Sequence, residues 1–193
     1  MNELEIIRSQ LTVEQTHAAE VTNACAAVFG TAGTAPAPSE TTTLFREACV
    51  SYLVWVLARF EERDQTLSEL LVARQSQANA AAASVRALAP LIARSGTSRE
   101  ALARLEAALA AGESENARMA WQQFAHFFNS AWAARRAALE RALAEHLAVA
   151  DWRAVCAIDA DSMLDERRRF ERVAAQLPAG VELRRTRTAG LGS

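Results

Sequence analysis

Apolar residues recur every three or four positions in the first part of the chain, at Leu4, Ile7, Leu11, Ala18, Val21, Cys25 and Val28. This spacing places their side chains on one face of an α-helix, so we expect a first helix over residues 2–29. Glu14 interrupts the apolar face, and His17 follows it about one helical turn later. The first helix therefore carries a carboxylate and an imidazole where apolar side chains are expected.

A second helix is expected to carry the stretch ACVSYLVWVLARF, residues 48–60, which is apolar on almost every side. It follows a loop over residues 30–43 that is rich in Gly, Pro and Thr, from which Ser39 can cap it. The stretch is too short for a membrane span, which needs about 20 apolar residues. A helix without a polar face is surrounded by protein or forms a subunit interface. We therefore expect residues 52–60 to be core on nearly every side, with a homodimer contact as a further possibility.

Three more helices are expected further along the chain. Thr97 and Glu100 form a capping-box pattern for a short helix. A long helix rich in aromatic residues begins at Ser114, and Asp151 is placed to cap a last helix that Pro178 ends. No segment alternates between apolar and polar residues as a β-strand does.

These elements predict an all-α fold. A chain of 193 residues is long enough for one domain with one sizeable core. We expect a single antiparallel up-down helical bundle over residues 1–178, formed by four main helices and a short extra helix. Residues 179–193 are expected to be a flexible tail.

Composition and charge exclude several function classes. The net charge of −2 gives no electrostatic basis for binding nucleic acid or an acidic membrane surface. Acidic residues stand at the N-terminus where a signal peptide has basic ones, so we expect a cytoplasmic protein. All 21 basic residues are arginines, which together with the many alanines indicates the coding bias of a bacterial genome.

The chain has few of the residues that carry common chemistry. Its three cysteines lie far apart without a CxxC pair, which excludes a zinc knuckle and c-type haem attachment and predicts buried thiols. It has only three histidines and neither a Ser-His-Asp motif nor a glycine-rich phosphate loop. An enzyme is therefore the less favoured interpretation.

The pair Glu14-x-x-His17 is the strongest polar anomaly in the sequence. Carboxylate-bridged di-iron bundles use this spacing, because iron binds hard oxygen ligands together with a nitrogen ligand. A complete site of that kind needs a second such pair, which this chain lacks. A partly buried ion pair or a cavity-lining acid is the competing interpretation.

The stretch SYLVWVLARFEERDQTLSELL, residues 51–71, resembles the second helix of hemerythrin-like (HHE cation-binding) proteins. A later stretch, residues 127–155, is similar to the end of that domain. The resemblance covers roughly residues 2–160, and it implies a four-helix bundle that holds a di-iron centre with about five histidines. His17 lies where the first helix of that family carries a ligand histidine. The positions that match the family pattern are Tyr52, Leu67, Leu71, Trp132, Leu147, Asp151 and Trp152.

The ligand positions depart from the family pattern. The two histidines expected in the second helix fall on Phe60 and Glu61, and Asp64 stands in place of the glutamate. The ligand step of the later helix falls among Ala134, Arg135, Arg136 and Ala138. Phenylalanine and alanine cannot bind iron, and arginine repels it.

Two functions remain open, beside a third interpretation as a helical partner domain without hemerythrin ancestry. The first is a diverged hemerythrin-like bundle without its di-iron centre or any other cofactor, which binds a small apolar ligand or a protein partner without catalysis. The alternative is a non-haem iron protein for oxygen binding, redox chemistry or sensing. It would use a rebuilt carboxylate-rich site made of Glu14, His17, Glu61 and Asp64.

Aromatic residues supply a second set of candidate positions, for a ligand or an interface. His126 lies between two tryptophans and can bind a ligand in an aromatic pocket, or act as a hydrogen-bonded histidine at an interface. The candidate positions are Tyr52, Trp121, Phe124, His126, Phe128 and Trp132.

Overall fold

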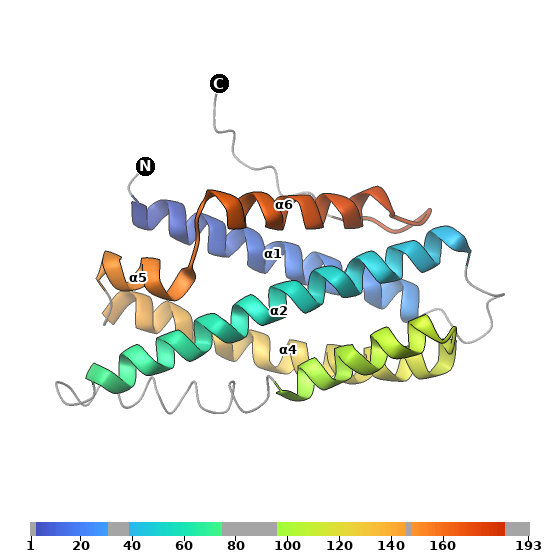
Figure 1. Cartoon of the computed structure of the whole chain (residues 1–193), viewed down its shortest axis with the longest axis horizontal. Helices are drawn as coiled ribbons and strands as arrows, with labels where there is room; N and C mark the ends of the chain where they lie inside the picture. Colours follow the sequence, from blue (N-terminus) through green and yellow to red (C-terminus); the bar gives the residue numbers. More distant parts are fainter. Residues whose placement is uncertain (1–2, 31–38, 75–95, 146–147, 184–193) are drawn as a thin grey trace, which may run out of the picture.

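The computed structural model describes residues 3–30, 39–74, 96–145 and 148–183, without the side chains of residues 30, 74 and 131–145. Every regular element in these ranges is a helix, so the all-α prediction is confirmed for the described part of the chain (Figure 1). None of the described helices is long and apolar enough to cross a membrane. The helices are, in chain order, α1 (Glu3–Gly30), α2 (Glu40–Arg74), a helix over residues 96–110, α4 (Ser114–Glu145), α5 (Val149–Cys156) and α6 (Ala160–Ala175).

Helix α1 is the central element of the packing. It contacts α2, α4, α5 and α6, and α2 in turn contacts α5 and α6. In Figure 1, α6 lies along one side of α1 and α2, and α4 and the 96–110 helix lie along the other. Side chains on α1 can therefore bond to partners from several helices.

The start of α2 follows the predicted capping. The Ser39 hydroxyl accepts a hydrogen bond from the Thr42 backbone N–H at 3.2 Å, which satisfies one of the free donors of the first turn. Because α2 begins at Glu40, the loop expected over residues 30–43 ends earlier than predicted.

The single last helix expected after Asp151 is wrong, because the chain forms two helices there. Asp151 lies inside α5, and its carboxylate accepts a hydrogen bond from the Ala148 backbone N–H at 2.8 Å. Ala157 then adopts the left-handed conformation with φ 45°, which ends α5. Asp159 caps α6 by accepting the Ser162 backbone N–H at 2.7 Å.

The chain stays packed beyond the residue where the flexible tail was expected to begin. Leu183 is buried, and Val181 packs against the core. The flexible tail over residues 179–193 stays a prediction, because residues 184–193 lie outside the described part.

The buried apolar side chains form two separate clusters. The large cluster joins α1, α2, the 96–110 helix, α4 and α6, and it contains Cys25 and Cys49. All three cysteines are buried free thiols, as predicted. The small cluster joins one end of α1 and α2 to α5, through Ile7, Leu11, Leu67, Leu71, Trp152, Val155 and Cys156.

Between the two clusters along α1 and α2 lies a set of buried polar side chains, which we call the polar layer: Glu14, His17, Arg63, Asp64 and Glu166. Both α1 and α2 pass from one apolar cluster to the other through this layer. Charged groups inside a protein need partners, because burial removes the water that stabilises them. The polar layer is therefore the first place to look for a site.

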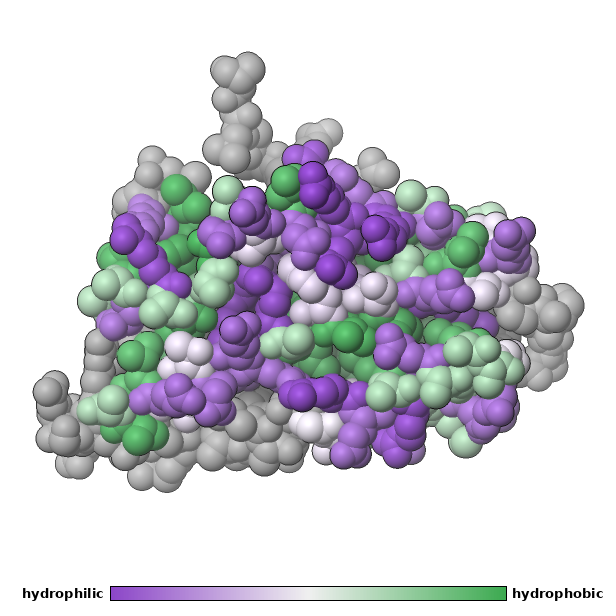
Figure 2. All heavy atoms as spheres, viewed as in Figure 1, coloured by the Kyte–Doolittle hydropathy of each residue, from purple (hydrophilic) through white to green (hydrophobic). Residues whose placement is uncertain are grey.

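One side of α2 is exposed between residues 52 and 60, contrary to the prediction that this stretch is core on nearly every side. Leu53, Val56 and Phe60 are buried, but Val54 is 38% exposed and Ala58 is also exposed. Figure 2 shows apolar surface between hydrophilic side chains on the face of the molecule that carries α2. The prediction failed because small apolar residues form part of the solvent-exposed face of this helix.

Candidate functional site

Arg63 joins three helices inside the polar layer. Its Nη1 donates to Oε2 of Glu14 at 2.5 Å, and its Nε donates to the backbone carbonyl of Cys156 at 2.9 Å. Glu14 has no exposed surface, and the Arg63 side chain is only 5% exposed. An ion pair so deeply buried is strong electrostatically but costly to desolvate, so loss of either partner leaves an uncompensated charge.

Arg59 adds a second positive charge beside Glu14. Its Nη2 lies 3.5 Å from Oε1 of Glu14 and donates to the carbonyl of Ala157 at 3.4 Å. Its guanidinium lies over the Trp55 ring, 5.1 Å from the centroid. The two arginines of α2 thus compensate Glu14 and bond carbonyls at the end of α5 that have no partner within that helix.

His17 and Tyr52 both bond to Glu166 of α6. His17 Nδ1 lies 2.8 Å from Glu166 Oε1, and the Tyr52 hydroxyl donates to the same oxygen at 2.9 Å. The His17 ring also stacks on Phe170, with 3.6 Å between the ring centroids. Burial, followed by the negative charge and hydrogen bond of Glu166, raises the pKa of Tyr52 well above its usual value.

The four residues predicted as a metal site are divided among different surroundings. Glu14 bonds to Arg63, while His17 bonds to Glu166. Glu61 pairs with Arg99 of the 96–110 helix, and Asp64 is buried. Among the described residues, no group of three or more His, Cys, Asp or Glu side chains is placed to hold a metal ion.

The chemistry of the buried donors does not fit the di-iron centre that the family resemblance implies. Iron sites are built from several carboxylates and imidazoles that point at one position. Here the Glu14 carboxylate points at two guanidinium groups, which repel a metal cation. Nδ1 of His17 is bonded to the carboxylate of Glu166.

The sequence analysis identified Glu14, His17 and Asp64 of the polar layer, but it missed Glu166 and the arginines that bind Glu14. Arg63 lies three residues after the buried Phe60 and four before the buried Leu67, so it occupies the core-facing side of α2. Arg59 lies inside the apolar stretch itself. Helical spacing could have identified Arg63 as buried, but it gives no information on which helix faces it.

Most of the candidate aromatic positions belong to the core. Trp121, Phe124 and Phe128 are buried in the large cluster, and Trp121 stacks on Phe29 with 5.3 Å between centroids. His126 lies on the exposed side of α4, with its ring edge against Phe127. The side chain of Trp132 lies outside the described part, so only its position in α4 is known.

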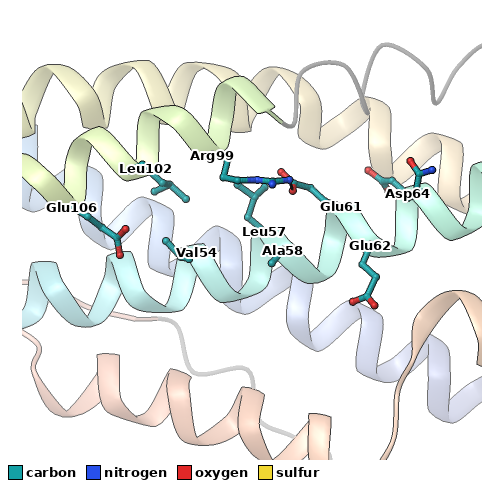
Figure 3. A pocket seen from close by; sticks show the side chains of 11 residues that line it. Val54, Leu57, Ala58, Glu61, Glu62, Asp64, Arg99, Leu102 and Glu106 are labelled. Atoms are coloured by element: carbon teal, nitrogen blue, oxygen red, sulfur yellow. Dashed lines mark hydrogen bonds and ion pairs between the residues drawn. The ribbon is translucent and has the colours of Figure 1, made fainter.

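A groove of about 520 Å³ runs between α2 and the 96–110 helix (Figure 3). The sequence analysis did not predict it, although small apolar residues on α2 directly before an acidic run were a usable signal. Its apolar lining consists of Val54, Leu57, Ala58, Leu102 and Ala103, and its charged lining consists of Glu61, Glu62, Asp64, Arg99 and Glu106.

Glu61 has an unusual environment in this groove. Arg99 donates to its Oε2, and its side chain is 10% exposed. Its other oxygen, Oε1, is buried and has no hydrogen-bond partner among the described residues. An unpaired buried carboxylate oxygen is unfavourable, so the groove retains an acceptor that an additional donor would satisfy.

No protein-family model matches this chain, and neither the curated proteins nor the solved structures include a significant match.

Proposed function

We propose that this protein is a binding module rather than an enzyme, and that its ligand is a protein partner. In this proposal the chain forms an antiparallel up-down bundle of the hemerythrin-like type. Ion pairs have replaced the metal ligands of that bundle, so its interior serves stability. The exposed groove along α2 serves recognition.

The observation that carries the proposal is the contact of Arg63 with Glu14 and with the carbonyl of Cys156. The family resemblance places a metal between these helices, but here a guanidinium bonds the carboxylate of α1. The resemblance also expects a histidine at position 60, where a buried phenylalanine stands. Both features favour a structural role for the polar layer.

The groove supports partner binding. Its apolar lining includes the partly exposed Val54, and acidic side chains lie beside it. Recognition grooves for helices combine an apolar floor with polar groups at the rim. This arrangement supports a protein partner over a catalytic site.

A metal measurement tests the first part of the proposal. We expect protein purified from iron-supplemented cells to be colourless and to hold iron far below a stoichiometric amount. Stoichiometric iron with an oxo-bridge absorption band would contradict the replacement of the metal site. Loss of that iron in His17→Ala would then establish the rebuilt carboxylate-rich site.

A dye experiment tests the second part. Nile red is an uncharged probe whose fluorescence rises on apolar surfaces, and we expect the native protein to bind it. Val54→Asp should reduce the signal, because it places a charge in the groove. Ser51→Asp is the matched control, since Ser51 is also exposed on α2 but does not line the groove. Equal signals from both variants would contradict binding in the groove.

A further inference from the structure

We propose that the groove between α2 and the 96–110 helix binds a basic amphipathic helix of a partner protein. This inference rests on the proposed function and specifies the chemistry of the partner. Three observations carry it: the length of the groove, the placement of its charges, and the unpaired oxygen of Glu61.

The groove is long enough for a short helix. Its lining on α2 extends from Val54 to Gln65, which corresponds to about 16 Å at about 1.5 Å per residue. The 96–110 helix forms the other wall and runs in the opposite direction, because Arg99 pairs with Glu61 while Glu106 lies near Val54 (Figure 3). The length of the groove corresponds to about three turns of a third helix.

The charges of the groove indicate the sign of the charge that the partner carries. Four carboxylates and one guanidinium line the groove. Glu61 is paired with Arg99, and Asp64 is buried with an interaction of its own, so Glu62 and Glu106 are the exposed acids of the groove. Glu106 lies at one end of the apolar floor, and Glu61 and Glu62 lie toward the other (Figure 3). A complementary helix has an apolar centre with a basic residue near each end.

The unpaired oxygen of Glu61 strengthens this argument. Within the part of the chain that the structure describes, its Oε1 is buried without a hydrogen-bond partner, although Arg99 binds the other oxygen of the same carboxylate. Because this oxygen has almost no exposed surface, an arginine or lysine of the partner would donate to it and remove this penalty only after the Glu61 side chain turns toward the groove. An acidic or uncharged helix has no charged donor with which to do so.

A labelled peptide provides the direct test. The probe is a fluorescein-labelled synthetic helix of about 12 residues, with leucines along one face and arginine near each end. We expect saturable binding to the full chain by fluorescence anisotropy, weakening as salt is raised. The double variant Glu62→Arg with Glu106→Arg should lower the affinity by about tenfold or more. Both glutamates are exposed, so the double variant should still fold.

The matched control is Glu47→Arg with Glu100→Arg. These residues are exposed on the same two helices, outside the groove, and the substitutions change the net charge equally. The control should bind the probe as the unmodified chain does. A peptide with glutamate in place of arginine should show the reverse preference and bind best to the groove variant.

Several results would overturn the inference. Equal binding by the groove variant and the control would show that charge acts nonspecifically. In a second outcome, the basic peptide fails to bind while Nile red still distinguishes Val54→Asp from Ser51→Asp. This result would support binding in the groove and contradict a basic helix as the partner. A dimer in light scattering that the groove variant dissociates and the control does not would identify a second copy of this chain as the occupant.

Discussion

His17 and Tyr52 approach the same oxygen atom, Oε1 of Glu166, from two different helices. The imidazole nitrogen lies 2.8 Å from this oxygen and the phenol oxygen 2.9 Å. One carboxylate of α6 therefore holds α1 and α2 together at a point with almost no solvent. Each of these groups is buried, and measurements on single residues can test how they are bonded.

Tyr52 is the only tyrosine in the chain, so its ionisation can be measured directly. Burial and the carboxylate of Glu166 raise its pKa well above 10. We expect no tyrosinate absorbance in the native protein as the pH rises through 10, and ionisation near pH 10 in concentrated urea. A native titration near pH 10 would show that the hydroxyl is not held in this environment.

Arg63 should be essential to the stability of the fold. Arg63→Met leaves the buried Glu14 without its closest cation, and we expect a loss of about 3–5 kcal/mol in the free energy of unfolding. Urea denaturation followed by circular dichroism measures it. The double variant Glu14→Leu with Arg63→Met removes both charges and should recover much of the loss. A double variant no more stable than Arg63→Met would contradict the pairing.

Val54 and Val56 should differ sharply in their tolerance of charge. Val56 has no exposed surface, so Val56→Asp should cost about 3 kcal/mol or more. Val54 is 38% exposed, and Val54→Asp should change stability by much less. Urea midpoints of the two variants provide the comparison, and equal midpoints would contradict the assigned faces of α2.

Cys156 should make the fold sensitive to alkaline pH. Burial raises the pKa of its thiol from 9.0 to about 11. The folded state holds the thiol proton more tightly than the unfolded state does. The protonated thiol therefore contributes to stability, and this contribution is complete below pH 9. It is lost as the pH rises from 9 to 11, by roughly 2–3 kcal/mol. The urea midpoint should fall between pH 8 and pH 10.5, and it should fall less in Cys156→Ala than in the unmodified protein. An equal fall in the two proteins would exclude the thiol as a cause.

The sequence was informative where local chemistry determines the structure. Helical spacing predicted α1 closely, and the Ser39 cap of α2 needs only residues within one turn. Glu14 was identified as anomalous because it interrupts an apolar face. In each case the information lies within a few neighbouring residues, where propensity and capping operate.

The remaining features depend on contacts between distant residues. The partner of Glu14 is 49 residues away on α2, and Glu166 is 149 residues from His17. The break between α5 and α6 depends on Ala157, which adopts a conformation that alanine rarely takes. The groove requires two helices side by side, which periodicity within either helix cannot predict.

The polar layer also limits how this protein can evolve. Glu14 cannot change alone without leaving Arg63 buried and unpaired, and the converse holds for Arg63. A lineage can exchange such a pair only through a destabilised intermediate or through two nearly simultaneous substitutions. In divergent sequences with this fold, we therefore expect positions 14 and 63 to covary, while the apolar positions of both clusters drift more freely among residues of similar volume.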